Sequence, residues 1–176
     1  AVNTVRAVRP GATILLTDSS VTSPEFWELF RARGATSLAG VPHTFDLLDR
    51  LRFRDQTWPT LRSMTQAGGR MAAEKVLDYA RWARDRGVRF HVMYGQTEAA
   101  PRMAHVPPEL LLENADCIGQ AVPGGSFEIR DESGNEILGP DEVGELVYSG
   151  PNVMLGYALN WPDAVNLRAP AGSAID

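Results

Sequence analysis

The stretch that decides the fold is RFHVMYGQTEA, residues 89–99. Its first half is apolar at Phe90, Val92 and Met93, which is typical of a short buried strand. Gly95 then ends the strand, and three polar residues follow it. In an open α/β sheet, ligands bind at the carboxyl ends of the strands. The sequence therefore predicts a ligand-binding loop directly after this strand.

The side chains of this loop suit a nucleotide. Tyr94 can stack on a base, and Gly95 allows the backbone to approach a ligand closely. Thr97 can donate a hydrogen bond to a phosphate oxygen, and Glu98 can hold Mg²⁺. The same residues also fit an ordinary turn after a strand. From their chemistry alone, both interpretations stay open.

Composition narrows the class of protein. The chain has 176 residues, of which 44% are hydrophobic and 22% charged, so it can form one or two globular domains with a real core. A net charge of −5 without a basic run argues against a nucleic-acid partner. No apolar stretch approaches the roughly 20 residues that span a bilayer. A single cysteine, Cys117, is typical of a reducing compartment, so a cytoplasmic protein without a membrane span is predicted.

Upstream of residue 94 the pattern alternates between strands and helices. Strands are predicted over 13–17, 36–39, 61–66 and 88–94, and helices over 24–33, 42–51 and 71–86. Short links between alternating elements mean parallel strands with right-handed crossovers. The glycine turn at residues 67–69 also follows a strand. We therefore expect this turn and the loop at 94–98 to lie at one edge of the sheet.

The pattern changes after Arg102. A short helix is predicted over 107–114, followed by brief strands at 127–130 and 144–148 that are separated by glycine turns, as in an antiparallel sheet. The predicted fold class is thus α/β, with a parallel sheet flanked by helices over residues 1–115 and a smaller antiparallel β segment over 116–176. A helix over 2–9 and a loop over 160–176 complete the prediction.

Several segments resemble one family. MYGQTEA at 93–99 is similar to the Y-G-x-T-E core motif of the adenylate-forming superfamily, which includes acyl- and aryl-CoA synthetases, luciferases and adenylation domains of peptide synthetases. GELVYSGPNVMLGY at 144–157 resembles a second core motif. QAGG at 66–69 and IGQAVPGG at 118–125 fall in the expected order, and LAGVPHTF at 38–45 resembles the start of the family's substrate-side helix.

The resemblance implies a two-step ligase. A small-molecule carboxylic acid would attack the α-phosphate of ATP to give an acyl-adenylate and pyrophosphate, and a thiol or an amine would then take the acyl group. Joining two anions requires a metal and cationic donors near the developing charge. The implied cofactors are ATP/AMP and Mg²⁺, with coenzyme A as the expected second substrate. MYGQTEA looks more like the acyl-CoA branch than a peptide-synthetase adenylation domain.

The resemblance also assigns roles to residues. Tyr94 would stack on adenine, while Thr97 would bind the α-phosphate and Glu98 the Mg²⁺, which makes Thr97 and Glu98 the predicted catalytic residues. The predicted nucleotide-binding residues are Ala67, Gly68, Gly69, Tyr94, Gly95, Gln96 and Thr97. His43 and Met93 stand where such enzymes line the acyl pocket. His43 could instead simply cap the helix that begins there.

Three expected segments are missing from the printed sequence. They are the family's phosphate loop with its lysine, the T-G-D segment after residue 157, and the lysine of the mobile C-terminal domain. Lys75 is the only lysine, and we expect it to be solvated on the charged side of a surface helix. The chain is therefore expected to be the central piece of a longer enzyme, inactive alone. The alternative is a non-enzymatic, flavodoxin-like nucleotide-binding module.

Overall fold

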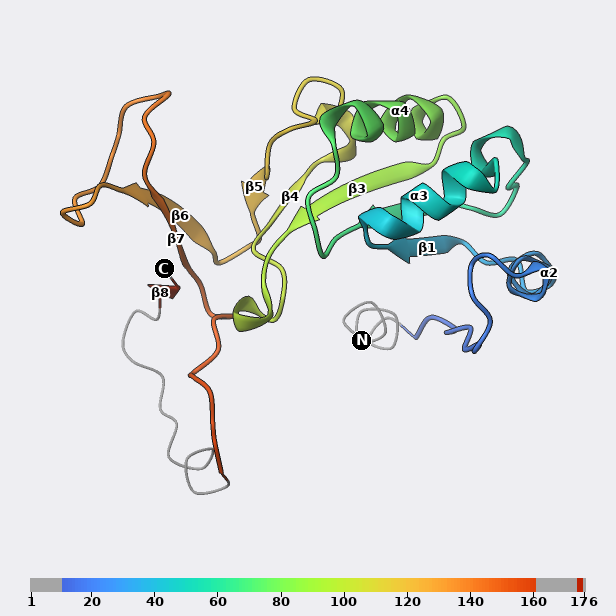
Figure 1. Cartoon of the computed structure of the whole chain (residues 1–176), viewed down its shortest axis with the longest axis horizontal. Coiled ribbons are helices and arrows are strands. Elements are labelled where there is room, and N and C mark those ends of the chain that lie inside the picture. Colours follow the sequence, from blue (N-terminus) through green and yellow to red (C-terminus); the bar gives the residue numbers. More distant parts are fainter. Residues whose placement is uncertain (1–10, 161–173, 176) are drawn as a thin grey trace. The chain divides into compact units, whose positions relative to one another are not determined.

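The computed structural model describes residues 11–160 and 174–175, and the chain falls into two compact units (Figure 1). Unit 1 runs up to Tyr94 and resumes over His105–Gly119. Unit 2 holds Gly95–Ala104 and the chain from Gln120 onward. The chain therefore passes between the units after Tyr94, after Ala104 and after Gly119.

Unit 1 is built on three parallel strands. They are β1 (Ser37–Gly40), β2 (Ser63–Gln66) and β3 (Arg89–Tyr94). Gln66 pairs with Gly40 on one side and Val92 on the other, so these strands end at one edge. The sheet order is β1-β2-β3-β4-β5, in which β4 is Ala104–Val106 and β5 is Gln120–Ala121. The predicted α/β fold class is confirmed.

Two helices cover one face of the parallel strands (Figure 1). Helix α3 (Pro42–Arg50) joins β1 to β2, and α4 (Ala73–Arg84) joins β2 to β3. Phe45 of α3 meets Tyr79 of α4 edge-on with ring centroids 4.9 Å apart. Both rings also pack against Phe90 of β3, at 5.6 and 5.8 Å. This apolar layer holds the helices on the sheet.

A second aromatic cluster anchors helix α2 (Pro24–Ala32), which precedes β1. Trp58 is its centre: it stacks on Phe53 at 4.6 Å and contacts Trp27 of α2 at 4.9 Å. The indole nitrogen of Trp58 donates to the carbonyl of Phe53 at 2.9 Å, which satisfies its polar group in the core. Phe53 itself begins the short 3₁₀ helix η1 (Phe53–Asp55).

Unit 2 contains the antiparallel sheet. Strand β6 (Ser126–Arg130) pairs with β7 (Glu145–Ser149), and β7 also pairs with β8 (Ala174–Ile175). After β6 the Asp131 carboxylate accepts hydrogen bonds from the N–H groups of Ser133 and Asn135, at 2.9 and 2.8 Å. These bonds shape the turn that leads away from β6. The predicted antiparallel segment is confirmed.

Two sequence predictions are wrong. Residues 13–17 form no strand, and Leu16 is 83% exposed. A short apolar run becomes a strand only where another strand pairs with it, and no described strand pairs with this one. Residues 107–114 form no α-helix and contain only the 3₁₀ turn η3 (Pro108–Leu110).

The helix predicted over 2–9 and most of the loop predicted over 160–176 lie outside the described residues. Among the residues that the structure does describe, no helix is long and apolar enough to cross a membrane.

Candidate active site

The carboxyl edge of β1, β2 and β3 carries most of the predicted site residues of unit 1. A turn follows each strand there, and the turn after β1 requires glycine. A Cβ on Gly40 would lie 2.6 Å from the Cβ of Thr44 in α3. The Thr44 hydroxyl accepts a hydrogen bond from the N–H of Val41 at 3.3 Å and so caps the helix. Thr44, not His43, therefore fills the capping role.

The turn after β2 is stabilised by a hydrogen bond from a buried side chain. Gln66 is only 1% exposed, and its amide nitrogen donates to the carbonyl of Gly69 at 2.7 Å. The N–H of Ala67 donates to the carbonyl of Gly40 at 3.2 Å, which ties this turn to the end of β1. Gly68 has φ +84° and lies against Val41. The backbone of Ala67–Gly69 is thus fixed and lies at the surface.

Tyr94 is the last residue of β3 and lies at the same edge as the Ala67–Gly69 turn, because β2 and β3 run parallel in register. Its side chain is 38% exposed. Met93 is half-buried, and His43 is exposed in the first turn of α3. The structure therefore brings His43, Ala67–Gly69, Met93 and Tyr94 to one edge of unit 1.

The loop after β3 begins with a glycine that cannot be replaced without movement. A Cβ on Gly95 would lie 2.1 Å from the carbonyl oxygen of Pro101 and 2.9 Å from the Cα of Arg102. Both neighbours are backbone atoms, so no side-chain rotation relieves the overlap. Gly95 therefore allows residues 95–102 to fold back on themselves as a compact loop.

Within this loop Thr97–Ala99 form the 3₁₀ turn η2. Ala99 is buried with Met103 and Tyr148, whereas Thr97 is exposed. The amide nitrogen of Asn152 donates to the carbonyls of Ala99 and Arg102, at 2.6 and 2.9 Å. The loop is thus stabilised by buried Ala99 and by the hydrogen bonds from Asn152, and the polar side chains of Thr97 and Glu98 remain outside the core.

The carboxylate of Glu98 accepts a hydrogen bond from the hydroxyl of Tyr157. This bond lowers the pKa of Glu98 below its usual value and raises the pKa of Tyr157. Glu98 is therefore ionised at neutral pH, and Tyr157 remains a proton donor. An ionised carboxylate is a suitable ligand for a hard cation.

The donor set limits the kind of metal that these residues could hold. No group of three or more His, Cys, Asp or Glu side chains gathers anywhere in the described part of the chain. Mg²⁺ is commonly bound through one or two carboxylates together with substrate phosphates. Glu98 fits that pattern, in which the cation arrives with a nucleotide.

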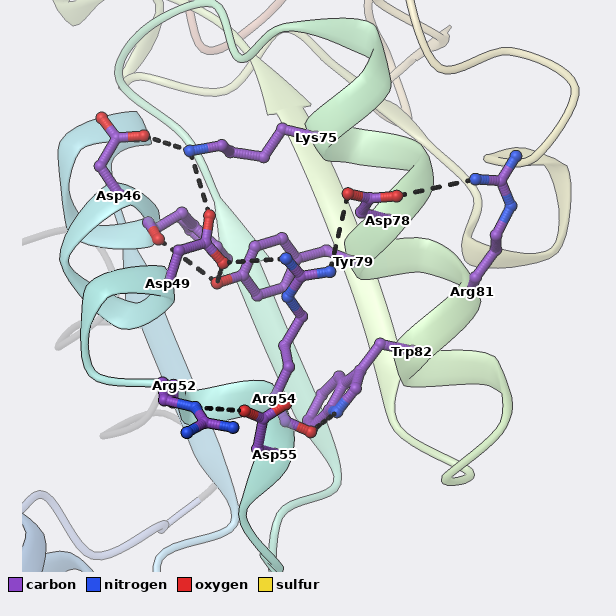
Figure 2. A network of polar contacts seen from close by, with 11 residues as sticks. Asp46, Asp49, Arg52, Arg54, Asp55, Lys75, Asp78, Tyr79, Arg81 and Trp82 are labelled. Atoms are coloured by element: carbon purple, nitrogen blue, oxygen red, sulfur yellow. Dashed lines mark hydrogen bonds and ion pairs between the residues drawn. The ribbon is translucent and has the colours of Figure 1, made fainter.

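Lys75, predicted to be solvated, is instead the centre of an ion-pair network between α3 and α4 (Figure 2). Its ammonium group contacts the carboxylate of Asp46 and lies 3.1 Å from that of Asp49. Asp49 also accepts a hydrogen bond from Tyr79 at 2.9 Å and lies 3.3 Å from Arg54. The solvated assignment is wrong, because two α3 carboxylates lie within reach of this α4 residue.

A hollow of about 430 Å³ opens next to this network, lined by Asp49, Arg52, Phe53, Arg54, Asp55 and Trp82. A crossover helix runs antiparallel to its strands, so the C-terminal end of α3 lies at the amino edge of the sheet. The hollow is therefore at the opposite edge from Tyr94 and the Ala67–Gly69 turn. Its arginines are already paired, Arg52 with Asp55 and Arg54 with Asp49.

Sequence reasoning did not identify Asn152 and Tyr157 as site residues, although both lie in the GELVYSGPNVMLGY segment. They contact the loop across 53 and 59 residues of chain, respectively. The only signal in the sequence was the motif itself. Cys117 is a free, exposed cysteine.

The fold defines the class: an α/β protein with glycine-bearing turns where the strands of a parallel sheet end. A family model described as "AMP-binding enzyme" matches residues 2–158. The chain therefore belongs to the AMP-binding enzyme family, within the adenylate-forming superfamily.

Sequence similarity to individual CoA ligases supports this family assignment. The long-chain-fatty-acid–CoA ligase of Salmonella typhimurium is 35% identical over 132 residues, which cover 74% of this chain and 22% of that protein. The indoleacetate–CoA ligase of Aromatoleum aromaticum is 30% identical over 161 residues, or 91% of this chain and 30% of that protein. The chain thus spans less than a third of either ligase.

A solved structure shows the same fold. It is the O-succinylbenzoate–CoA synthetase of Bacillus subtilis in complex with ATP and magnesium ion, with a TM-score of 0.72 and 21% sequence identity. The match covers 89% of this chain and 31% of that one.

Proposed function

We propose that this chain is part of an ATP-dependent carboxylate ligase that forms an acyl-adenylate and then an acyl-CoA thioester. In the first step a carboxylate oxygen bonds to the α-phosphorus of ATP, and the bond from that phosphorus to the bridging oxygen breaks to release pyrophosphate. In the second, the thiolate of coenzyme A attacks the acyl carbon, and AMP leaves. Acids differing as widely as fatty acids and indoleacetate are named for the relatives, so the acyl group itself stays open.

One observation carries the proposal. The Tyr94–Glu98 loop directly follows β3, whose end shares its edge with the Ala67–Gly69 turn, in a chain of the AMP-binding enzyme family. Ligands of open α/β sheets bind at this edge. The family assignment favours a ligase over the flavodoxin-like module that the sequence left as an alternative.

The nucleotide roles follow from the surfaces that each residue offers. Tyr94 exposes a ring on which adenine can stack, and the fixed backbone of Ala67–Gly69 can pass close to the base and the acyl group. Gly95 and Gln96 carry the chain from Tyr94 to η2. Thr97 is exposed, and its hydroxyl can donate to the α-phosphate and so hold it for attack.

Glu98 would hold the Mg²⁺ of the nucleotide through its ionised carboxylate. When bound, the cation supplies positive charge that neutralises the phosphates as the acid attacks. Glu98 also fixes where the phosphates lie relative to Thr97, because both side chains belong to the same turn. His43 and Met93, at the edge of unit 1, are the residues that we propose for the acyl pocket.

We propose that the remaining machinery lies outside the printed sequence. Lys75 is tied to Asp46 and Asp49, so it is not a mobile cation for the reacting phosphate. A phosphate loop and a catalytic lysine would have to come from other parts of a longer ligase. The printed chain alone would then not catalyse adenylation. Within the family, a peptide-synthetase adenylation domain remains the second form of the same chemistry.

The test is Glu98→Gln in the full-length protein, which keeps the shape of the side chain and deletes its charge. Loss of one preorganised electrostatic contact lowers kcat about 10²–10³-fold. We expect a loss of that size, a higher Mg²⁺ concentration for half-maximal adenylation and an unchanged melting temperature. Glu145→Gln is the matched control, since Glu145 is an exposed carboxylate of the same unit. A wild-type Mg²⁺ titration in Glu98→Gln would reject the metal role.

A further inference from the structure

The segment that follows β7, Asn152–Tyr157, is hydrogen-bonded to both the backbone and a side chain of the loop that contains η2, within unit 2. The amide nitrogen of Asn152 donates to the carbonyl of Ala99, the last residue of η2, and to that of Arg102. The N–H of Met154 donates to the carbonyl of Glu98 at 2.7 Å. Three residues later, the hydroxyl of Tyr157 donates to the carboxylate of the same glutamate. Glu98 is therefore held at both its backbone and its side chain by one short segment.

The path of the chain between these two contacts depends on Gly156. Its φ of +141° is a conformation that favours glycine. The bend lets the chain leave Glu98 at Met154 and return its next side chain, Tyr157, to the same residue. The bend explains why a glycine precedes a tyrosine at the end of the 144–157 motif. Neither residue has a role in the reaction proposed above.

We propose that Tyr157 is a positioning residue that orients the carboxylate of Glu98 for the metal-bound nucleotide. The inference rests on the proposed function of Glu98. A carboxylate has two oxygens and about four acceptor sites, so the bond to Oε1 leaves Oε2 for a cation. A glutamate on the surface otherwise samples many rotamers, and the hydroxyl restricts it to one. Partners of this kind typically change metal affinity or activity by about 10–100-fold when they are removed.

The surroundings of Tyr157 separate this role from a structural one. Its side chain is 71% exposed, so the fold gains little from burying it. Tyr148 offers the contrast: it is fully buried, and its hydroxyl donates to the Oδ1 of Asn152 at 2.8 Å. Both tyrosines lie in unit 2 and both donate a hydroxyl, but only Tyr157 reaches Glu98.

The experiment compares Tyr157→Phe, Tyr148→Phe, Glu98→Gln and the double variant Glu98→Gln/Tyr157→Phe in the full-length protein. Mn²⁺ replaces Mg²⁺ as the probe, and its binding in the presence of ATP is followed by the electron paramagnetic resonance signal of the free ion. Thermal unfolding is measured on the same samples.

We expect Tyr157→Phe to weaken Mn²⁺ binding about 10-fold or more with no change in melting temperature. Tyr148→Phe should do the reverse, lowering the melting temperature and leaving Mn²⁺ affinity within about twofold. Because Tyr157 acts through Glu98, the double variant should bind Mn²⁺ no more weakly than Glu98→Gln alone.

Two results would overturn the inference while leaving the proposed function intact. One is wild-type Mn²⁺ affinity in Tyr157→Phe when Glu98→Gln binds weakly. The other is an additive loss in the double variant, which would mean that the two residues act independently. Wild-type Mn²⁺ affinity in Glu98→Gln would instead reject the metal role of Glu98, and with it the basis for Tyr157.

Discussion

The hydroxyl of Tyr79 offers a sharp test of how α3 is held to α4. Its ring is fully buried between Phe45 and Phe90, and its hydroxyl donates to Asp49 of α3 at 2.9 Å (Figure 2). Burial, followed by this hydrogen bond, raises the pKa of Tyr79 far above its usual value, so the hydroxyl stays protonated and donates. Tyr79→Phe keeps the ring and removes only the donor.

The expected loss in the free energy of unfolding depends on the ion pairs that Asp49 keeps in the Tyr79→Phe variant. A hydrogen bond to a charged group contributes about 1.5–3 kcal/mol. Asp49 is 26% exposed and keeps Lys75 at 3.1 Å and Arg54 at 3.3 Å, so the variant does not leave it unpaired. The low end of the range therefore applies, a loss of about 1.5 kcal/mol in the free energy of unfolding. Tyr79→Ala also removes the ring, and a loss of about 3–5 kcal/mol is expected.

The assay is urea unfolding of the protein followed by circular dichroism. Tyr157→Phe is the control, because it deletes an exposed hydroxyl and should change the free energy of unfolding by less than about 0.5 kcal/mol. If Tyr79→Phe is as stable as this control, the hydroxyl does not couple the helices and the reasoning is refuted. If Tyr79→Phe loses as much as Tyr79→Ala, the buried hydroxyl rather than ring packing dominates, which would also contradict the estimate.

Two further predictions concern a glycine and the ion pair. Gly95→Ala should destabilise the protein by about 1–3 kcal/mol in the same urea assay, because its Cβ would overlap the backbone of Pro101, whereas in Gly69→Ala the Cβ meets Pro42 at 3.2 Å and should cost less. Equal stability of the two variants would contradict the loop geometry. The hydrogen bond from Lys75 lowers the pKa of Asp46 below its usual 3.8. The contribution of ionised Asp46 to the free energy of unfolding is therefore present above pH 3.8 and is lost as pH falls through the lowered pKa. The hydrogen bond to Asp46 likewise raises the pKa of Lys75 above 10.5. The contribution of charged Lys75 to the free energy of unfolding is therefore lost only as pH rises through the raised pKa. The stability difference between wild type and Lys75→Met should therefore be constant from about pH 5 to about pH 10 and shrink on either side, and a difference that does not depend on pH would contradict this pairing.

Local chemistry in the sequence was enough for most of unit 1. Proline and glycine at the ends of α2 and α3, and the apolar face of α4, predicted these helices to within a few residues. Short links between helices and strands then required parallel pairing, which β1, β2 and β3 show. These features depend on interactions between residues close in the chain, and a periodic pattern records such interactions directly.

The same local reasoning failed where a partner decides the outcome. Residues 13–17 have the apolar run of a strand, but pairing is a property of two segments, and the run alone does not specify the second. Lys75 lies among charged residues of α4, which indicated a solvated side chain. Its true neighbours, Asp46 and Asp49, belong to α3 and become visible only once the helices pack together.

The candidate site divides in the same way. The sequence by itself determined the Y-G-x-T-E loop after a strand and the glycine turn at 67–69, because motif and strand end are both written locally. Only the tertiary structure brought Tyr157 to Glu98 and Asn152 to Ala99, across 59 and 53 residues. These contacts join the segment after β7 to the loop after β3, and no periodic pattern near Glu98 predicts them, because the two segments are far apart in the sequence.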